Sequence, residues 1–315
     1  MGSDIILNNT IRINSYFLTK EIFNQTNLKN NRFRLKLTIC LYILFKYCSN
    51  EYNSFQYIFN KPAGFSISLL EIYEECFLGR DKRYTIKILK DAFQDLIDNG
   101  IGDFQLYCFI NNNGNNSENL KDNTQIHINE FSSSIFPLAN KANVLFKRKE
   151  FLKIINLCSK SYSSNSQSGK IKVESLLTIF LYLKYIDYIS NSKSRSKKVA
   201  FEISYRTINK YTGINYHSVK KYTDFLENNE MLYSFWLGNY IKNIDNKTVI
   251  QAAPTIYTLT KNYGAMVRKT IQLKKTLIGI NASNSDNNSQ DAIYFSQAGE
   301  LFGRWQKEKE QERNK

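Results

Sequence analysis

Residues 203–232, ISYRTINKYTGINYHSVKKYTDFLENNEML, predict two short helices joined by a tight turn. The turn contains Gly213, and glycine adopts the left-handed backbone that other residues avoid. Ser204 and Asn215 stand directly before the predicted helices 205–211 and 216–229, where their side chains can cap free backbone N–H groups. This stretch therefore predicts a helix-turn-helix.

The second of these helices is amphipathic. Spacings of three, three and one place four residues on one side of a 3.6-residue helix, which we expect to face the core: Val219, Tyr222, Phe225 and Leu226. The opposite side is polar and basic, and we expect it to face solvent: Tyr216, His217, Lys220, Lys221 and Asp224. An outward basic flank on the last helix of a helix-turn-helix is typical of helices that enter the major groove of DNA.

Two parts of the chain share one order of elements. In residues 171–260 an apolar helix at 173–189 precedes the helix pair, and strands at 232–237 and 248–259 follow it, joined by a polar loop. Three helices followed by a hairpin are the order of a winged helix-turn-helix. The two parts share no obvious sequence identity, so the repeat is one of architecture.

Residues 32–131 give the first occurrence of that order. Residues 34–48 predict a buried helix, and Ser68 with Glu71 forms a capping-box pattern for a helix that runs to Leu78. A strong helix is expected over 84–99, ended by Gly100. The expected hairpin has strands at 104–110 and 125–128 and an Asn-rich tip at 111–123.

The fold class predicted from these patterns is mainly α with small β-hairpin wings, an α+β fold with two winged helix-turn-helix units in tandem. The remaining segments are expected to be an N-terminal arm at 1–31 with a short helix near 18–23, a connecting segment at 132–170 and a C-terminal segment at 261–315. The connecting segment would hold a helix at 143–158 and a Ser-rich linker at 159–169. The C-terminal segment would hold a basic amphipathic helix at 260–277 and a polar charged tail, disordered or helical.

Charge points to the partner. The 315 residues include 43 Lys and Arg against 28 Asp and Glu, a net charge of +15, which favours a polyanion and above all double-stranded DNA. No run of residues is apolar and long enough for a membrane span, and no signal peptide is read at the start. Five cysteines without a Cys-x-x-Cys pair are expected to be reduced core residues of a cytoplasmic protein.

Catalytic patterns are missing from the sequence. It has no Walker loop, no Gly-x-Gly-x-x-Gly, no His-Glu-x-x-His and no Gly-x-Ser-x-Gly. With only two histidines, a metal site is not expected either. We therefore expect no enzyme and no cofactor.

Candidate DNA-binding residues fall into three groups. The second helix-turn-helix supplies Tyr205, Arg206, Asn215, Tyr216, His217, Ser218, Lys220 and Lys221. A basic loop before it supplies Lys193, Arg195, Lys197 and Lys198, and the first unit supplies Arg80, Lys82, Arg83, Lys87 and Lys90. Merely solvated lysines on a protein-binding module remain the alternative for the second unit. A dimerisation or scaffold module remains the alternative for the first.

The second helix-turn-helix resembles the DNA-reading heads of GntR-type regulators and of phage and plasmid replication proteins. The resemblance covers about thirty residues and lies in Tyr211-Thr212-Gly213-Ile214, Ser218-Val219, Leu226-Glu227 and Leu232. Two such units in one chain resemble the replication initiators of iteron plasmids, in which one unit mainly dimerises and the other mainly binds origin repeats. The resemblance implies a plasmid or phage replication initiator; a homodimer and host replication proteins are partners that it could have.

Two other functions stay open at the level of the sequence. One is a transcriptional regulator, or repressor, of a mobile element, which would use the same DNA-reading head at a promoter. The other is a partition or protein-interaction adaptor that uses winged helices as scaffolds. A domain that senses a small molecule would have favoured the regulator, and none is evident because both units predict winged helices.

Overall fold

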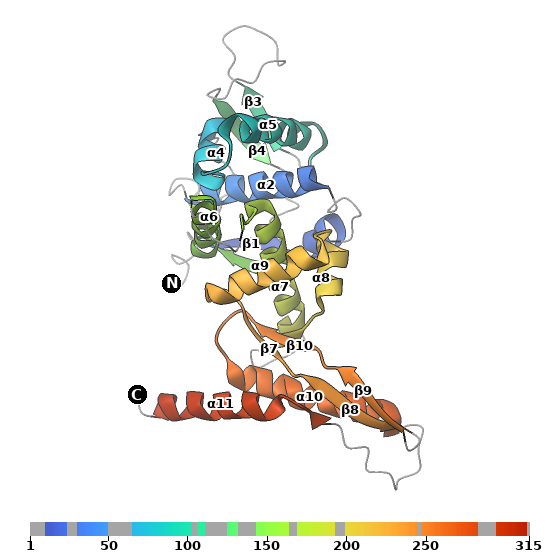
Figure 1. The fold of residues 1–315 in the computed structure, drawn as a ribbon. Coiled ribbons are helices and arrows are strands. Elements are labelled where there is room, and N and C mark those ends of the chain that lie inside the picture. Colours follow the sequence, from blue (N-terminus) through green and yellow to red (C-terminus); the bar gives the residue numbers. More distant parts are fainter. Residues whose placement is uncertain are drawn as a thin grey trace, which may run out of the picture. The chain divides into compact units, whose positions relative to one another are not determined.

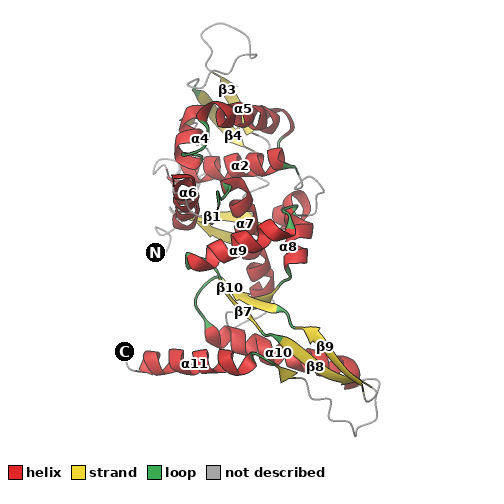
Figure 2. Ribbon diagram, viewed as in Figure 1, coloured by secondary structure: helices red, strands yellow, loops and turns green. Residues whose placement is uncertain are grey.

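The computed structural model describes residues 10–23, 30–49, 65–101, 106–110, 125–131, 143–163, 169–192, 199–244, 247–282 and 294–313. It is mainly helical, with small antiparallel sheets (Figures 1 and 2). The chain divides into two compact units, Met1–Tyr185 with Asn209–Asn215, and Ile186–Ile208 with Tyr216–Lys315. Among the described helices, none combines the length and apolar character that a membrane span requires.

The first unit begins with a short strand, β1, and continues through helices and strands into α7. Its elements are β1 (Thr10–Asn14), α1 (Ser15–Phe17), the π-helix η2 (Leu18–Ile22), α2 (Asn31–Ser49), β2 (Phe65–Ile67), α4 (Leu69–Cys76), α5 (Lys82–Asn99), β3 (Leu106–Ile110), β4 (Ile126–Phe131), β5 (Asn143–Lys147), α6 (Arg148–Ser163) and the first part of α7 (Val173–Ser192). The short helix expected near 18–23 is this π-helix.

Side-chain caps set the ends of α4 and α5. The Ser68 hydroxyl accepts a hydrogen bond from the N–H of Glu71 at 3.1 Å, as the capping-box pattern predicts. Asp81 does the same for Tyr84 at 2.7 Å, so α5 begins two residues earlier than expected. Gly100 ends α5 with a φ of 59°, and its N–H donates to the carbonyl of Leu96.

The strands β2, β3 and β4 of the first unit form a three-stranded sheet. Its order is β2-β4-β3, with both pairs antiparallel, and Ile67 is the register partner of Ile126. The order along the chain is thus helix α2, strand β2, helices α4 and α5, and then β3 and β4. The tip expected at 111–123 lies outside the described residues.

The expected helix at 143–158 is wrong at its start. Residues 143–147 form β5, which pairs antiparallel with β1, and only 148–163 are helical. Val144 and Phe146 are buried while Leu145 between them is exposed, so the period is two and not 3.6. The Phe146 ring lies 5.3 Å from that of Phe45, which fixes β5 against α2.

The described residues of the N-terminal segment and those on both sides of the linker belong to the first unit. Ile11 and Ile13 of β1 are buried, and Phe23 packs edge-on against Tyr182 at 4.8 Å, so the described part of the expected arm belongs to a core. The division of the compact units therefore differs from a boundary at the Ser-rich linker. Across that linker the N–H of Ile171 donates to the Ser161 hydroxyl at 3.0 Å.

From α7 onward the chain repeats the element order that runs from α2 to β4, and the second unit then extends it. Its elements are the last part of α7, β6 (Phe201–Glu202), α8 (Tyr205–Thr212, whose last four residues belong to the first unit), α9 (Tyr216–Asn228), β7 (Tyr233–Trp236), β8 (Asn239–Ile244), β9 (Lys247–Ala252), β10 (Thr255–Thr258), α10 (Tyr263–Ala282), β11 (Tyr294–Phe295) and α11 (Ala298–Arg313). The sheet order β6-β10-β7 places the last strand of the series in the centre, as β2-β4-β3 does in the first unit.

The hairpin of the second unit is longer than the sequence suggested. The polar stretch expected to be a loop contains the strand β8, and the single strand expected at 248–259 is two strands, β9 and β10. β8 pairs with β9 and with β11 in a second sheet of order β11-β8-β9. Gly238 enters this sheet with a φ of 78°, and its carbonyl accepts from Ala253 N–H at 2.8 Å.

The C-terminal segment packs as part of the second unit. Of the two outcomes left open for the tail, the structure has the helix, α11, and this helix packs against α10 (Figure 1). Leu301 is fully buried in a core shared with Phe235 and Met266. Lys309 lies over the ring of Trp305 at 4.0 Å, so charges of the tail cover apolar surface.

Candidate nucleic-acid interface

The buried side of α9 follows the predicted phase. Val219, Tyr222 and Leu226 are buried, as expected, whereas Phe225 is only half-buried. Thr223, on the same side of α9, is also buried. Its hydroxyl donates a hydrogen bond to the carbonyl of Val219 at 3.1 Å. A threonine is tolerated there because that hydrogen bond satisfies its polar atom.

The opposite side of α9 faces solvent. Tyr216 is 50% exposed, and His217 and Lys220 are exposed as well, while Ser218 and Lys221 are half-buried. The first two turns of α9 therefore present an aromatic ring, an imidazole and an ammonium group. All three are groups that can contact bases or phosphates.

Local hydrogen bonds build the turn before α9. The Ser204 hydroxyl accepts from Thr207 N–H at 3.0 Å and caps α8, as predicted. Gly213 has a φ of 65°, and its N–H donates to the backbone carbonyl of Asn209 at 2.9 Å. The Asn209 side chain in turn donates to the Ile214 carbonyl at 2.7 Å, so the glycine's left-handed backbone is locked by neighbouring bonds.

Three other predicted residues of this unit lie around the turn. Asn215 and Arg206 are exposed, and Tyr205 is half-buried at the start of α8. The Tyr205 ring meets the Tyr216 ring edge to face, with centroids 5.8 Å apart and planes at 72°. Tyr216 meets His217 in the same manner, at 5.7 Å and 88°.

The first unit presents a comparable flank on α5. Lys82, Arg83 and Lys87 are exposed and Lys90 is half-buried, while Leu89, Phe93 and Leu96 face the core. Sequence reasoning missed Tyr84, which is exposed in the first turn of α5. The signal was available, because Tyr84 precedes the buried series that starts at Thr85 and Ile86 and falls outside its helical phase.

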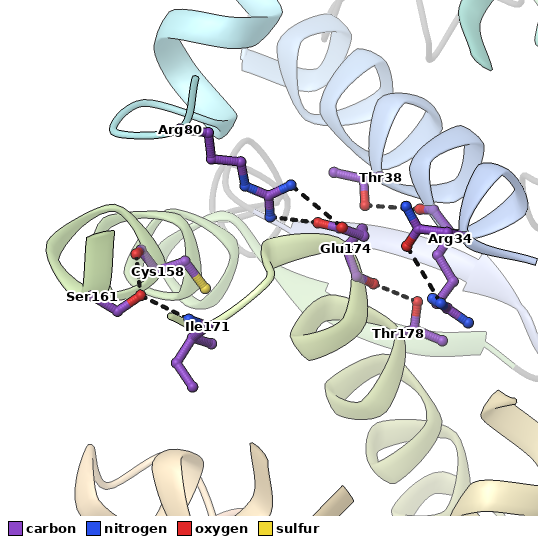
Figure 3. Close-up of polar contacts among 9 residues, drawn as sticks. Arg34, Thr38, Arg80, Cys158, Ser161, Ile171, Glu174 and Thr178 are labelled. Atoms are coloured by element: carbon purple, nitrogen blue, oxygen red, sulfur yellow. Dashed lines mark hydrogen bonds and ion pairs between the residues drawn. The ribbon is translucent and has the colours of Figure 1, made fainter. Parts of the chain in front are cut away.

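Arg80 does not belong with these exposed cations. Its side chain is 11% exposed, and its guanidinium makes two hydrogen bonds, of 2.6 and 3.3 Å, to the carboxylate of Glu174, which is 1% exposed (Figure 3). The guanidinium also lies over the rings of Phe77 and Tyr162. Burial opposes the charged form of Arg80, but the Glu174 carboxylate outweighs it and holds the pKa above its usual value.

This pairing removes Arg80 from the candidate interface. The Glu174 carboxylate engages two of the five N–H donors of the guanidinium, and the buried Arg80 side chain is not presented to a DNA phosphate as the exposed cations are. The prediction that Arg80 contacts phosphate is therefore corrected to a structural role inside the first unit.

The four residues of the basic loop, Lys193, Arg195, Lys197 and Lys198, lie outside the described residues. The residues that flank the loop are described. Asn191 of α7 accepts a hydrogen bond on its side-chain oxygen from the N–H of Val199, at 2.7 Å. Its amide nitrogen donates to the carbonyl and the carboxylate of Asp187. One asparagine thus joins the two flanks of the loop.

The described residues provide cations and aromatic rings for binding. In that part of the chain, no group of three or more His, Cys, Asp or Glu side chains is arranged to hold a metal ion. The described thiols, Cys40, Cys76 and Cys158, are buried, and burial raises the pKa of each above its usual value.

No protein-family model, curated protein or solved structure matches this chain.

Proposed function

We propose that this protein binds double-stranded DNA through two winged helix-turn-helix units and acts in the cytoplasm as a replication initiator of a plasmid or phage. In this proposal α9 reads base edges, the basic loop at 193–198 contacts phosphates, and α5 with Lys82, Arg83 and Lys87 forms a second contact. A second copy of the chain and host replication proteins are its further partners.

The strand order supports the assignment of both units as winged helices. From α2 to β4 the chain has a helix, a short strand, two helices and two further strands. From α7 to β10 it has the same order with β8 and β9 inserted before the last strand, and in each series the last strand pairs with the short strand and with the strand that follows the two helices. This arrangement leaves the third helix, α5 or α9, with one side on its core and the other side outward. In helix-turn-helix proteins that outward side enters the major groove, with its N-terminal residues on the bases.

The observation that carries the proposal is the outward side of α9. Tyr216, His217 and Lys220 are exposed in its first two turns, where this docking geometry places base contacts. The net charge of +15 adds the electrostatic attraction that all duplex DNA provides. The role in replication depends on the resemblance to initiators with two winged helices.

Removing His217 and Lys220 together tests the DNA-reading role of α9. We expect His217→Ala/Lys220→Ala to weaken binding to duplexes selected from a random pool, because each lost base contact costs about 1–3 kcal/mol. Binding to unselected duplex should weaken less, because phosphate contacts carry it. Fluorescence anisotropy with labelled duplexes at one fixed salt concentration measures both affinities.

The matched control removes two exposed lysines of α6 in Lys149→Ala/Lys153→Ala. This variant should bind selected and random duplex with nearly the wild-type preference. Equal losses for selected and random duplex in the His217 and Lys220 variant would show that another element reads the bases.

Replication is tested in a minimal replicon that carries this gene and its flanking DNA. Deletion of the gene should abolish maintenance of the replicon, and the purified protein should bind repeated sites within it. A transcriptional regulator would instead bind a promoter and change transcript levels while the replicon persists. An adaptor would bind DNA without sequence preference. Either of the last two results would refute initiation.

A further inference from the structure

The exposed start of α9 carries an aromatic group of defined geometry. Tyr216 is half exposed and stands between the rings of Tyr205 and His217, each edge to face with it. We call these three residues the aromatic corner. Contact with two neighbouring rings restricts the Tyr216 side chain, so little conformational entropy is lost when a ligand packs on its exposed part.

The remaining chemistry of α9 limits which base it can read. Arginine or lysine can read guanine, and asparagine or glutamine can read adenine, through paired hydrogen bonds. The α9 sequence, YHSVKKYTDFLEN, contains no arginine or glutamine, and its one asparagine, Asn228, stands at its carboxyl end. Its cations are lysines, which suit phosphates as point charges. The distinctive group that α9 adds at its amino end is an apolar ring surface, for which the matching feature in the major groove is the C5-methyl group of thymine.

We propose that the aromatic corner recognises thymine, with the Tyr216 ring packed against the C5-methyl group of one thymine in each binding site. The inference depends on the proposed DNA-binding function and narrows it to sites that require thymine at one position. Tyr216 is then a specificity-determining residue beside the base contacts proposed for His217 and Lys220.

Uracil in place of thymine tests the inference, because it removes only the methyl group and keeps the base pairing. Duplexes of 20 base pairs that bind the full-length protein are selected from a random pool and then resynthesised with deoxyuridine at one thymine at a time. Affinities are measured for the wild type, Tyr216→Ala and Tyr216→Phe. Tyr16→Ala is the control, because Tyr16 is likewise an exposed tyrosine, at 57%, but lies in α1.

At one thymine of the selected site, uracil should weaken wild-type binding about fourfold, the amount expected for one buried methyl group. Tyr216→Ala should bind both duplexes equally, and Tyr216→Phe and Tyr16→Ala should keep the wild-type difference. Thermal unfolding checks that each variant is folded, and the comparison of thymine with uracil in the wild type requires no variant.

Two results would overturn the inference while leaving DNA binding intact. One is a selected site at which no thymine is sensitive to uracil; the other is a Tyr216→Ala variant that keeps the full sensitivity. Failure of the proposed function has a different signature, because no duplex would then be bound or enriched.

Discussion

At the scale of single residues, Arg80 and Glu174 form the most buried ion pair in the described part of the chain. The two residues are 94 positions apart, and the pair joins the loop before α5 to the start of α7 within the first unit. Both charges have lost most of their contact with water, so each depends on the other. We therefore expect the pair to act on stability and not on DNA.

Removing one partner of this pair should be costly. Arg80→Met leaves the Glu174 carboxylate buried without its cation, and we expect the free energy of unfolding to fall by about 3–5 kcal/mol. Urea unfolding followed by circular dichroism measures the change.

The double variant Arg80→Met/Glu174→Met is the control, since it removes both charges and should recover much of the lost stability. Its affinity for duplex DNA should equal that of the wild type. A loss of DNA affinity in the folded double variant would return Arg80 to the interface.

Residue-level prediction from sequence succeeded where the cause was local. The 3.6-residue period of α9 was sufficient to place Val219 inside and to expose His217 and Lys220. Arg80 could not be assigned in this way, because its partner is distant in sequence and an unpaired arginine in a loop resembles a surface cation. Tyr84 was missed although its place outside the helical phase of the buried residues of α5 marked it as exposed.

At the scale of elements, the helices were easier to predict than the strands. The expected bounds of α2, α5, α8 and α9 lie within three residues of those observed, because each has a cap or a long apolar period. β5 was taken for helix because VLF reads equally well as a helix or a strand when only five residues pair. Its partner β1 lies at the other end of the unit's sequence and gives no local signal.

The strands of the second unit show the same limit. β8, with the sequence NYIKNI, is rich in Asn and was read as a loop, yet it pairs on both sides, with β9 and β11. Pairing with two neighbours overrides the weak intrinsic preference of asparagine for strands. The extension formed by β8, β9, β11, α10 and α11 therefore could not be derived from periodicity.

At the scale of the whole molecule, charge is the property that sequence alone establishes best. The excess of basic residues is a sum over the chain and needs no fold. The division into compact units was less accessible, because it depends on contacts such as that between Ser161 and Ile171 on either side of an apparent linker. A serine-rich composition marks a linker only if its flanking residues do not bind each other.

The salt dependence of duplex binding tests the central claim, that this chain binds DNA through the cationic residues of α9 and of the loop at 193–198. The logarithm of the binding constant should fall linearly with that of salt concentration, with a slope of about −0.9 for each phosphate contacted. Replacing Lys193, Arg195, Lys197 and Lys198 by Ala should reduce the slope by about 3 to 4 if each contacts one phosphate. Replacing the exposed Lys149, Lys153, Lys160 and Lys172 removes the same charge and should leave the slope nearly unchanged. Absence of duplex binding at low salt, or an equal loss of slope in the two variants, would contradict the claim.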